Sequence, residues 1–424
     1  MHILIVTDSY PPLIGGATRA AQQLGHHLVQ RGHRVSVATA WQHALPEQEN
    51  DAEIQVFRIR DLTSRMPWLS ADPHRHTPPP FPDPEAVWRF RRLLHQIRPD
   101  IVYAYGWLTY SCTAALLGTR TPLIIAARDY GNICALRTLV RHGQICDGPM
   151  PRKCLECATS FYGVPKGIVA VAGVLGGRTL LRRKMRALQS CSGFVQGLMH
   201  RYLLARHSGG KQSDQDEIPD RVIPDFREDT DEGPPDEAIL NRLPAEPFIL
   251  FVGALRLIKG LEPLIAAYNS LDTPPPLVLI GTRSPDTPHT FPRGVTVLYD
   301  VPHATVMAAW KRALFGVAPS LLPEPLGNVI HEGMSKGKAM IGTTPGGHAE
   351  MITEGVNGLL VPAGDADALA AAMQRLLVDP TLRVQLGDAA RVRARRFTAT
   401  VVMPEFEALF DEVMRAPRNS GGLS

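Results

Sequence analysis

The sequence predicts an α/β protein made of two Rossmann-like, doubly wound domains. Short apolar runs recur along the chain and alternate with segments whose apolar residues lie three or four positions apart, which are typical of buried parallel strands and amphipathic helices. Several of the apolar runs end in glycine-containing turns, where the backbone can approach a ligand closely. A chain of 424 residues is also long for one hydrophobic core, so we expect two domains.

The first 38 residues have the pattern of a βαβ unit. Residues 3–6 and 35–38 are predicted strands, and the helix between them has apolar residues at Ala21, Leu24 and Leu28. Gly15 and Gly16 lie between the first strand and this helix, either to let the backbone approach a ligand or as a plain tight turn. The turn does not match G-x-G-x-x-G, so it does not indicate a dinucleotide site.

The same patterns place the remaining elements and divide the chain into domains at 1–225 and 226–397. An acidic segment with glycine and proline, 225–235, is the expected linker. The further predicted strands are 54–59, 100–104, 122–127, 247–253, 277–280, 295–298, 338–341 and 357–361. The further predicted helices are 85–97, 166–186, 365–377, 381–396 and 398–414.

Composition excludes several classes of protein. Hydrophobic residues make up 44% of the chain and charged residues 20%, as in an ordinary globular protein, and a net charge of +4 does not indicate a nucleic-acid partner. The longest apolar run, 168–175, is shorter than a membrane span. The N-terminus reads as a strand and not as a signal peptide, so we expect a cytoplasmic protein with reduced cysteines.

The segment 320–354 carries the strongest functional signal. Glu324 and Glu332 are separated by seven residues, with Gly327 between them where a loop should turn into a helix, and a Gly346-Gly347 turn follows the next strand. A helix N-terminus suits a phosphate, and carboxylates accept hydrogen bonds from vicinal sugar hydroxyls. The segment therefore favours a ligand with two sugar rings on either side of a diphosphate. The alternative is that Glu332 is an ordinary solvated helix residue.

This segment resembles the E-x7-E signature of the family-4 retaining glycosyltransferases, and the resemblance extends over nearly the whole chain. It implies the GT-B fold, with two Rossmann-like domains facing across a cleft and a terminal helix, 398–416, that packs back on the first domain. It also implies that Glu324 contacts the hydroxyls of the donor sugar, that Glu332 binds the nucleotide ribose, and that the backbone of Leu326, Gly327 and Asn328 holds the diphosphate.

Other positions match the family in part. The family pattern G-R-L-x-x-x-K-G corresponds to 253–260, where Lys259 matches but Ala254 replaces the arginine. Arg256 lies two residues further on and would point to the same side in extended backbone, so we expect it to substitute as a diphosphate ligand. Arg128 stands where the family usually has a histidine near the reacting carbon, and a guanidinium cannot accept a proton. The resemblance also gives Gly15 and Gly16 a place beside the donor phosphates and the acceptor.

The reaction that the resemblance implies is transfer of a hexosyl group from a nucleotide-diphosphate sugar to a hydroxyl acceptor, with retained configuration and front-face attack. No metal is needed for the chemistry, because a helix terminus and cations supply positive charge. Two alternatives remain: a catalytically silent nucleotide-sugar-binding protein and a GT-B sugar-nucleotide epimerase. The sequence identifies neither the donor sugar and its base nor the acceptor.

Four cysteines in one segment suggest a structural site. Cys134, Cys146, Cys154 and Cys157 have the spacing C-x11-C-x7-C-x2-C, which suits a structural zinc; an iron–sulfur cluster or four thiols without metal are the alternatives. His74 and His76 have no such partners and indicate a solvated loop.

The predicted helix 166–186 combines an apolar run with the basic residues Arg178, Arg182, Arg183, Lys184 and Arg186. Such a helix can lie on an anionic membrane surface, or it can be a solvated face of the first domain. Peripheral membrane contact through this helix is therefore one expectation.

Overall fold

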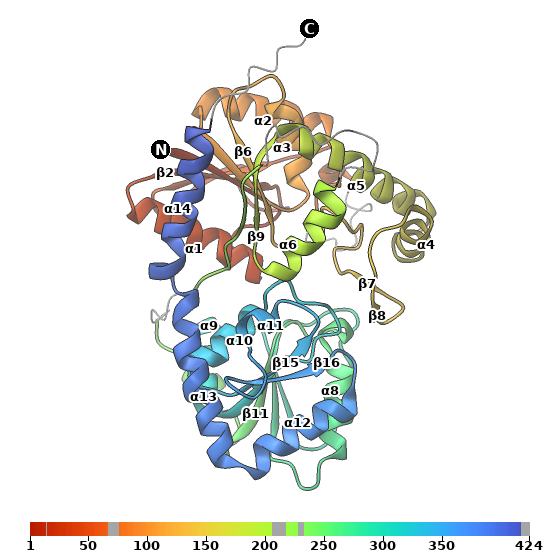
Figure 1. The fold of residues 1–424 in the computed structure, drawn as a ribbon, viewed down its shortest axis with the longest axis vertical. Coiled ribbons are helices and arrows are strands. Elements are labelled where there is room, and N and C mark those ends of the chain that lie inside the picture. The colour runs from red at the N-terminus through yellow and green to blue at the C-terminus, as the bar shows by residue number, and fades with distance from the viewer. Residues whose placement is uncertain (14, 67–75, 206–217, 228–232, 417–424) are drawn as a thin grey trace. The chain divides into compact units, whose positions relative to one another are not determined.

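The computed structural model describes residues 1–13, 15–66, 76–205, 218–227 and 233–416, and the chain divides into two compact units (Figure 1). Unit 1 contains Met1–Thr138, Asp147–Pro224 and the chain from Val402 onward. Unit 2 contains Leu139–Cys146 and Asp225–Val401. Each unit has its own sheet.

Over the described residues, the sheet of unit 1 has the strand order β10-β9-β6-β5-β1-β2-β4-β3. All neighbouring strands are parallel except β3 and β4, which are antiparallel. The strands are β1 His2–Thr7, β2 Arg34–Ala40, β3 Gln48–Asp51, β4 Ile54–Ile59, β5 Ile101–Ala104, β6 Leu123–Ala127, β9 Met185–Ser190 and β10 Asp220–Val222. The central strands β1, β5 and β6 are buried along their whole length, as strands covered on both faces must be.

Helices pack against this sheet, and α2 and α6 begin at side chains that cap them by hydrogen bonds. The Asp83 carboxylate caps α2 by accepting a hydrogen bond from the Ala86 N–H at 3.0 Å. The C-terminal helix packs on the sheet through Phe406 and Phe410, whose rings meet Tyr103 edge-on. The helices are α1 Gly16–Gln30, α2 Pro84–Ile97, α3 Leu108–Leu116, α4 Pro151–Tyr162, α5 Val164–Lys184, α6 Gly193–Met199 and α14 Ala399–Arg415.

Unit 2 has a parallel sheet with the order β13-β12-β11-β14-β15-β16 within the described residues. Its strands are β11 Phe248–Val252, β12 Leu277–Gly281, β13 Val295–Tyr299, β14 Ala313–Val317, β15 Met340–Thr344 and β16 Leu359–Pro362, with a separate hairpin of β7 Val140–Arg141 and β8 Gln144–Ile145. Its helices are α7 Glu237–Leu240, α8 Leu261–Ser270, α9 His303–Arg312, α10 Asn328–Ser335, α11 His348–Met351, α12 Ala366–Val378 and α13 Pro380–Ala394.

The α/β class and the parallel sheets are as predicted, and the following three segments are among those that differ from the prediction. Strand β3 has no apolar run that would predict it, because its sequence, QEND, is polar and lies at the sheet edge. The segment 194–204 resembles a strand and helix in sequence, but the last long strand of unit 1 is β9, directly after α5. The cysteine segment, for which the sequence predicted neither a helix nor a strand, contains the hairpin and α4.

Candidate active site

Three loops of unit 2 converge at the carboxyl ends of β11, β14 and β15, which are neighbours in the sheet. The loop after β11 touches the loop after β14, because the Leu321 N–H donates to the Ile258 carbonyl at 3.0 Å. The loop after β15 touches it as well, because the Gly347 N–H donates to the Glu324 carbonyl at 2.6 Å. The carboxyl edge of an open parallel sheet is the expected position for a ligand.

The Gly346-Gly347 turn is close-packed against the loop that carries Glu324. A Cβ atom on Gly347 would lie 2.3 Å from the Pro325 carbonyl oxygen and 2.5 Å from the Leu326 Cα. Gly346 has φ +146°, which other residues rarely adopt. Two glycines are therefore required for the turn to approach this backbone.

Glu324 and Lys259 form an ion pair between two of these loops. Lys259 Nζ donates to Glu324 Oε1 at 2.6 Å, and the two side chains are 29% and 14% exposed. Burial alone would raise the pKa of Glu324, but the Lys259 charge, together with the hydrogen bond it donates, holds that pKa below its ordinary value. Glu324 is therefore a carboxylate that accepts hydrogen bonds at neutral pH.

Helix α10 begins directly after Gly327, its N-cap residue, which has φ +97°. No side chain caps this helix by a hydrogen bond, so its first N–H groups depend on other partners. A Cβ atom on Gly327 would lie 2.3 Å from His348 Cδ2 and 2.6 Å from His348 Nε2. The His348 ring thus lies against the start of α10.

His348 is a buried neutral imidazole with a defined tautomer. The Thr343 N–H donates to His348 Nδ1 at 3.0 Å, so the ring proton is on Nε2. Burial lowers the pKa of His348 to about 4, an effect that Glu324 opposes and Lys259 reinforces. Among the described residues Nε2 has no hydrogen-bond partner, and it therefore offers a donor beside the helix N-terminus.

Glu332, in the second turn of α10, is engaged by two nitrogen-bearing side chains. Arg227 Nη1 lies 2.7 Å and His303 Nε2 lies 3.1 Å from Glu332 Oε1. The Arg227 and Glu332 side chains are 9% and 7% exposed, so this is a buried cluster and not a solvated helix residue. The backbone of Arg227 is fixed by its N–H, which donates to the Phe397 carbonyl.

Arg256 follows β11 but does not pair with Glu324. Its Nε lies 3.4 Å from Asp286 Oδ1 in a partly exposed ion pair, and the Leu257 N–H also donates to Asp286. Lys259 is therefore the cation of this loop that contacts Glu324, and the diphosphate role of Arg256 stays a prediction.

Unit 1 places its predicted site residues at the carboxyl edge of its own sheet. Gly15 precedes and Gly16 begins α1. Arg128, at the end of β6, lies over the Tyr105 ring with its Cζ 5.1 Å from the ring centroid. The predicted roles of Gly15, Gly16 and Arg128 stay predictions.

An ion cluster that the sequence did not reveal joins three strand ends in unit 1. Arg137 Nη1 lies 2.6 Å from Asp8 Oδ2, and the same guanidinium pairs with Asp129. Asp8 also accepts the N–H groups of Trp107 and Leu108 at the start of α3. The two carboxylates outweigh the effect of burial and raise the pKa of Arg137, so the cluster is permanently charged.

The described residues show no metal site at the four cysteines, so the structural zinc stays a prediction. Cys154 and Cys157 lie one turn apart on α4, Cys134 lies in the loop after β6, and Cys146 lies at the end of the hairpin that belongs to unit 2. No group of three or more His, Cys, Asp or Glu side chains comes close enough to bind a metal in the described part of the chain. His74 lies outside the described residues, and His76 instead contacts Asp61 at 2.7 Å.

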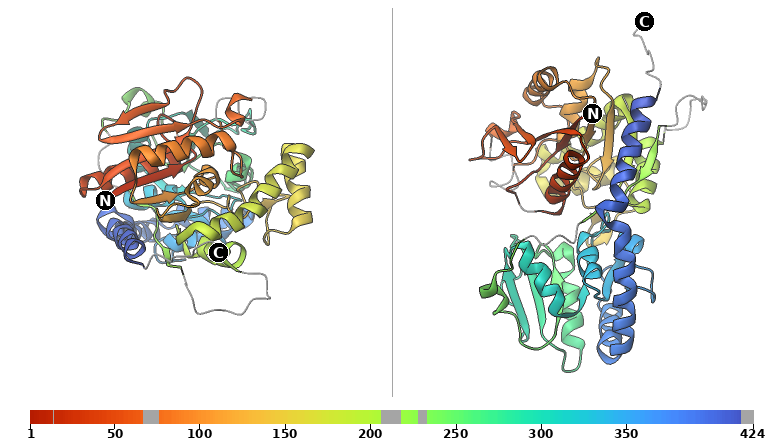
Figure 2. Two further views of the ribbon diagram at one scale, coloured as in Figure 1. Left: turned by 90° about the horizontal axis from the view of Figure 1, so that it is seen from above. Right: turned by 90° about the vertical axis from the view of Figure 1, so that its left-hand side faces the viewer.

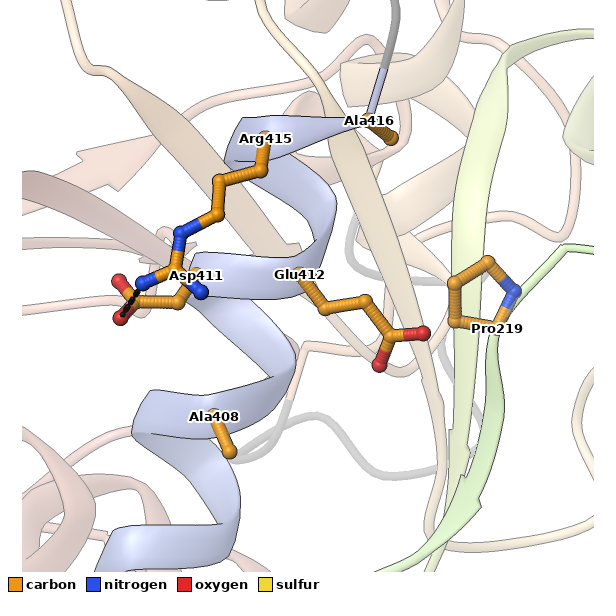
Figure 3. A pocket seen from close by; sticks show the side chains of 6 residues that line it. All are labelled: Pro219, Ala408, Asp411, Glu412, Arg415 and Ala416. Atoms are coloured by element: carbon orange, nitrogen blue, oxygen red, sulfur yellow. Dashed lines mark hydrogen bonds and ion pairs between the residues drawn. The ribbon is translucent and has the colours of Figure 1, made fainter.

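Two surface hollows of unit 1 lie away from these residues. One, of about 640 Å³, borders one side of α14, where Arg415 pairs with Asp411 on the same helix (Figure 3). The other, of about 320 Å³, is lined by Arg120, Lys184 and Arg186 among others. Neither contains a residue of the candidate site in unit 2.

Comparisons with known proteins identify the class. Residues 15–155 match the model described as glycosyl transferase 4-like domain, and residues 246–379 match the model described as glycosyl transferases group 1. The alpha-maltose-1-phosphate synthase of Mycolicibacterium smegmatis is 31% identical over 182 residues, which are 38% of this chain and 46% of that protein. The chain thus aligns with less than half the length of this relative.

Solved structures show the same fold over the full length. The sucrose-phosphate synthase of Thermosynechococcus elongatus is 21% identical, with a TM-score of 0.72 over 98% of this chain and 100% of the other. Anabaena HepE in complex with UDP-glucose is 17% identical, with a TM-score of 0.65 over 97% and 100%. The fold and the matches define a glycosyltransferase of the GT-B class. The chain belongs to the family-4 glycosyltransferases, as its E-x7-E segment indicated.

Proposed function

We propose that the protein transfers a hexosyl group from a nucleotide-diphosphate sugar to a hydroxyl acceptor with retention of configuration. One observation supports this above all: Glu324, Lys259 and His348 surround the uncapped start of α10. A carboxylate beside a cation and helix N–H donors suits a sugar joined to a diphosphate. Family membership supplies the reaction class.

The donor would lie across this site in an extended form. The N–H groups of Leu326, Gly327 and Asn328 would donate to the diphosphate, and the His348 Nε2–H would add a neutral donor at the same place. Glu324 would accept hydrogen bonds from the sugar hydroxyls. Glu332 would bind the ribose through the oxygen that does not face Arg227 and His303.

In the proposed reaction the bond between the anomeric carbon and the β-phosphate oxygen breaks as the acceptor oxygen attacks on the same face. The acceptor proton passes to the leaving phosphate oxygen, so no protein base is needed. Negative charge grows on the diphosphate, and Lys259 and the start of α10 stabilise it, with Arg256 contributing from the loop after β11. No metal has a role in these steps.

We assign the acceptor side to unit 1. Gly15 and Gly16 would border the donor phosphates and the acceptor, because they leave the backbone at the start of α1 accessible. Arg128 would donate to a sugar hydroxyl or phosphate and would not act as a base. HepE is described in complex with UDP-glucose, so UDP-hexoses are the donors to try first.

The test combines binding with turnover. Thermal shift against UDP-, GDP-, ADP- and dTDP-sugars identifies the donor class, because a ligand that binds the native state raises Tm. Nucleotide release is then measured with and without a panel of sugars, sugar phosphates and polyols. Release that depends on an acceptor, abolished in Glu324→Gln, supports the proposal. Donor conversion without an acceptor would identify an epimerase, and binding without any conversion would identify a silent binding protein.

A further inference from the structure

Helices α4 and α5 expose large apolar side chains on unit 1. Phe161 is 59% exposed at the end of α4, and Val164, Ile168 and Val169 are 63%, 47% and 49% exposed on α5. Figure 2 shows the two helices side by side at one edge of unit 1. Several large apolar side chains gathered on one surface are typical of an interaction site, because single ones scatter over most surfaces.

Helix α5 is apolar on both of its sides. The buried side packs on unit 1, and it is so close to α3 that a Cβ atom on Gly177 would lie 2.2 Å from the Tyr110 ring. The opposite side is exposed for its first two turns at Pro165, Ile168, Val169 and Ala172, without a charged residue. A helix on the surface of a soluble protein normally has polar residues there.

The helix nevertheless does not cross a bilayer. By length and composition α5 is the one helix of the described residues that would pass as a membrane span. However, Lys184, its last residue, is followed directly by β9, which pairs with both β6 and β10 in the sheet. Inserting α5 would remove a strand from the sheet and separate Gly177 from Tyr110. The exposed side can therefore meet a membrane only from the surface.

The charge of this region favours an anionic partner. Residues 151–186 contain eight lysines and arginines and one acidic residue, whereas the whole chain has a net charge of +4. Arg152 on α4 and Arg183 near the end of α5 are exposed. Other cations support the fold, since Arg178 and Lys184 donate to backbone carbonyls of unit 1. Exposed apolar side chains on a pair of helices with a net positive charge match the boundary between headgroups and acyl chains of an anionic leaflet.

We propose that the surface at the junction of α4 and α5, formed by Phe161, Val164, Ile168 and Val169 and called the α4–α5 face, docks unit 1 on an anionic lipid bilayer. The apolar side chains enter the headgroup boundary, and the net positive charge of the two helices, which includes the exposed Arg152 and Arg183, attracts the anionic headgroups. This inference goes beyond the transfer reaction and does not depend on it.

Co-sedimentation of the full-length protein with vesicles tests the proposal. We expect binding to vesicles of phosphatidylcholine with phosphatidylglycerol, weaker binding to pure phosphatidylcholine, and release by high salt. The variant Phe161→Gln/Ile168→Gln should lose affinity by about tenfold or more. The variant Arg152→Gln/Arg183→Gln should lose about tenfold on anionic vesicles and little on neutral ones.

Matched controls come from unit 2. Val384 and Val392 are 60% and 63% exposed on α13, so Val384→Gln/Val392→Gln removes a similar apolar area and should leave vesicle binding unchanged. The proposal is overturned if the wild-type protein does not sediment with anionic vesicles, or if Phe161→Gln/Ile168→Gln binds them as tightly as wild type. It is also overturned if sedimentation velocity shows a dimer that this variant dissociates and vesicles are not bound, since the face would then join two copies.

Discussion

The 2.6 Å hydrogen bond from Lys259 Nζ to Glu324 Oε1 joins the loop after β11 to the loop after β14. It fixes a cation and a carboxylate side by side at the sheet edge. Arg256 is only three residues from Lys259 in the chain, but it pairs with Asp286 and is 44% exposed. The two cations of one loop therefore have different environments.

We predict that Lys259→Met reduces nucleotide release far more than Arg256→Met. Loss of a cation that stabilises the leaving diphosphate costs about two to three orders of magnitude in turnover, as for other transition-state donors. The measurement is the rate of acceptor-dependent nucleotide release by each variant. Equal losses in both would show that Arg256 leaves Asp286 to share the diphosphate, as the sequence suggested.

Gly327 is required by its backbone conformation and by its contact with His348. Gly327→Ala should destabilise the protein by about 2–4 kcal/mol, since a positive φ costs about 1–2 kcal/mol and overpacking adds a similar amount. Gly355 has φ +69°, and a Cβ atom there would meet no other atom within 4 Å. Gly355→Ala therefore measures the cost of the positive φ without overpacking. Urea unfolding of the two variants separates the contributions. Equal destabilisation would mean that the His348 ring moves away without cost.

Glu332 is part of a buried ion cluster, and this affects how its substitution is interpreted. Glu332→Ala leaves the Arg227 guanidinium buried without its carboxylate, which should cost about 3–5 kcal/mol. Asp411→Ala, which breaks an exposed pair with Arg415, should cost less than about 1 kcal/mol. Urea unfolding compares the two. A loss below about 1 kcal/mol for Glu332→Ala would show that water enters and solvates Arg227. A loss of donor binding in Glu332→Ala can be assigned to the lost ribose contact only after the loss of stability in this variant has been measured.

The sequence predicted most of the fold, because its strands are continuous apolar runs and its long helices are amphipathic or apolar. It located Glu324, Gly327 and the Gly346-Gly347 turn, because their types and spacing are local features. It missed the partners that the fold brings from a distance. Arg227 lies in the segment expected to be a linker, and His303 lies 29 positions before the Glu332 that it contacts.

His348 and the cysteines illustrate opposite limits of sequence interpretation. His348 follows the two glycines directly, and a polar ring at that position is itself a signal for a ligand-side residue. The cysteine spacing suggested zinc, but spacing does not show that two of the thiols lie on a helix and one in another unit. Convergence of side chains is a property of the fold that a pattern within one segment does not contain.

The buried imidazole of His348 should make the stability of the protein depend on pH in the mildly acidic range. Its pKa is about 4 in the folded protein and 6.5 as its ordinary value, so the unfolded chain binds more protons between these values. The contribution of His348 to the free energy of unfolding is therefore fully present above about pH 6.5. It is lost as the pH falls toward 4, and the loss amounts to about 3 kcal/mol. Glu324, whose pKa is lowered, adds a loss in the same direction at still lower pH.

Urea unfolding of wild type and His348→Gln at several pH values between 6.5 and 4 measures this contribution. Glutamine keeps a polar side chain of moderate size but does not titrate, so the slope of unfolding free energy against pH should flatten in the variant. His331 is also buried in unit 2, where its Nε2 contacts the Ala394 carbonyl, and His331→Gln serves as the matched control. If the slope in His348→Gln is as steep as in wild type and in His331→Gln, the assignment is contradicted and the titrating group lies elsewhere.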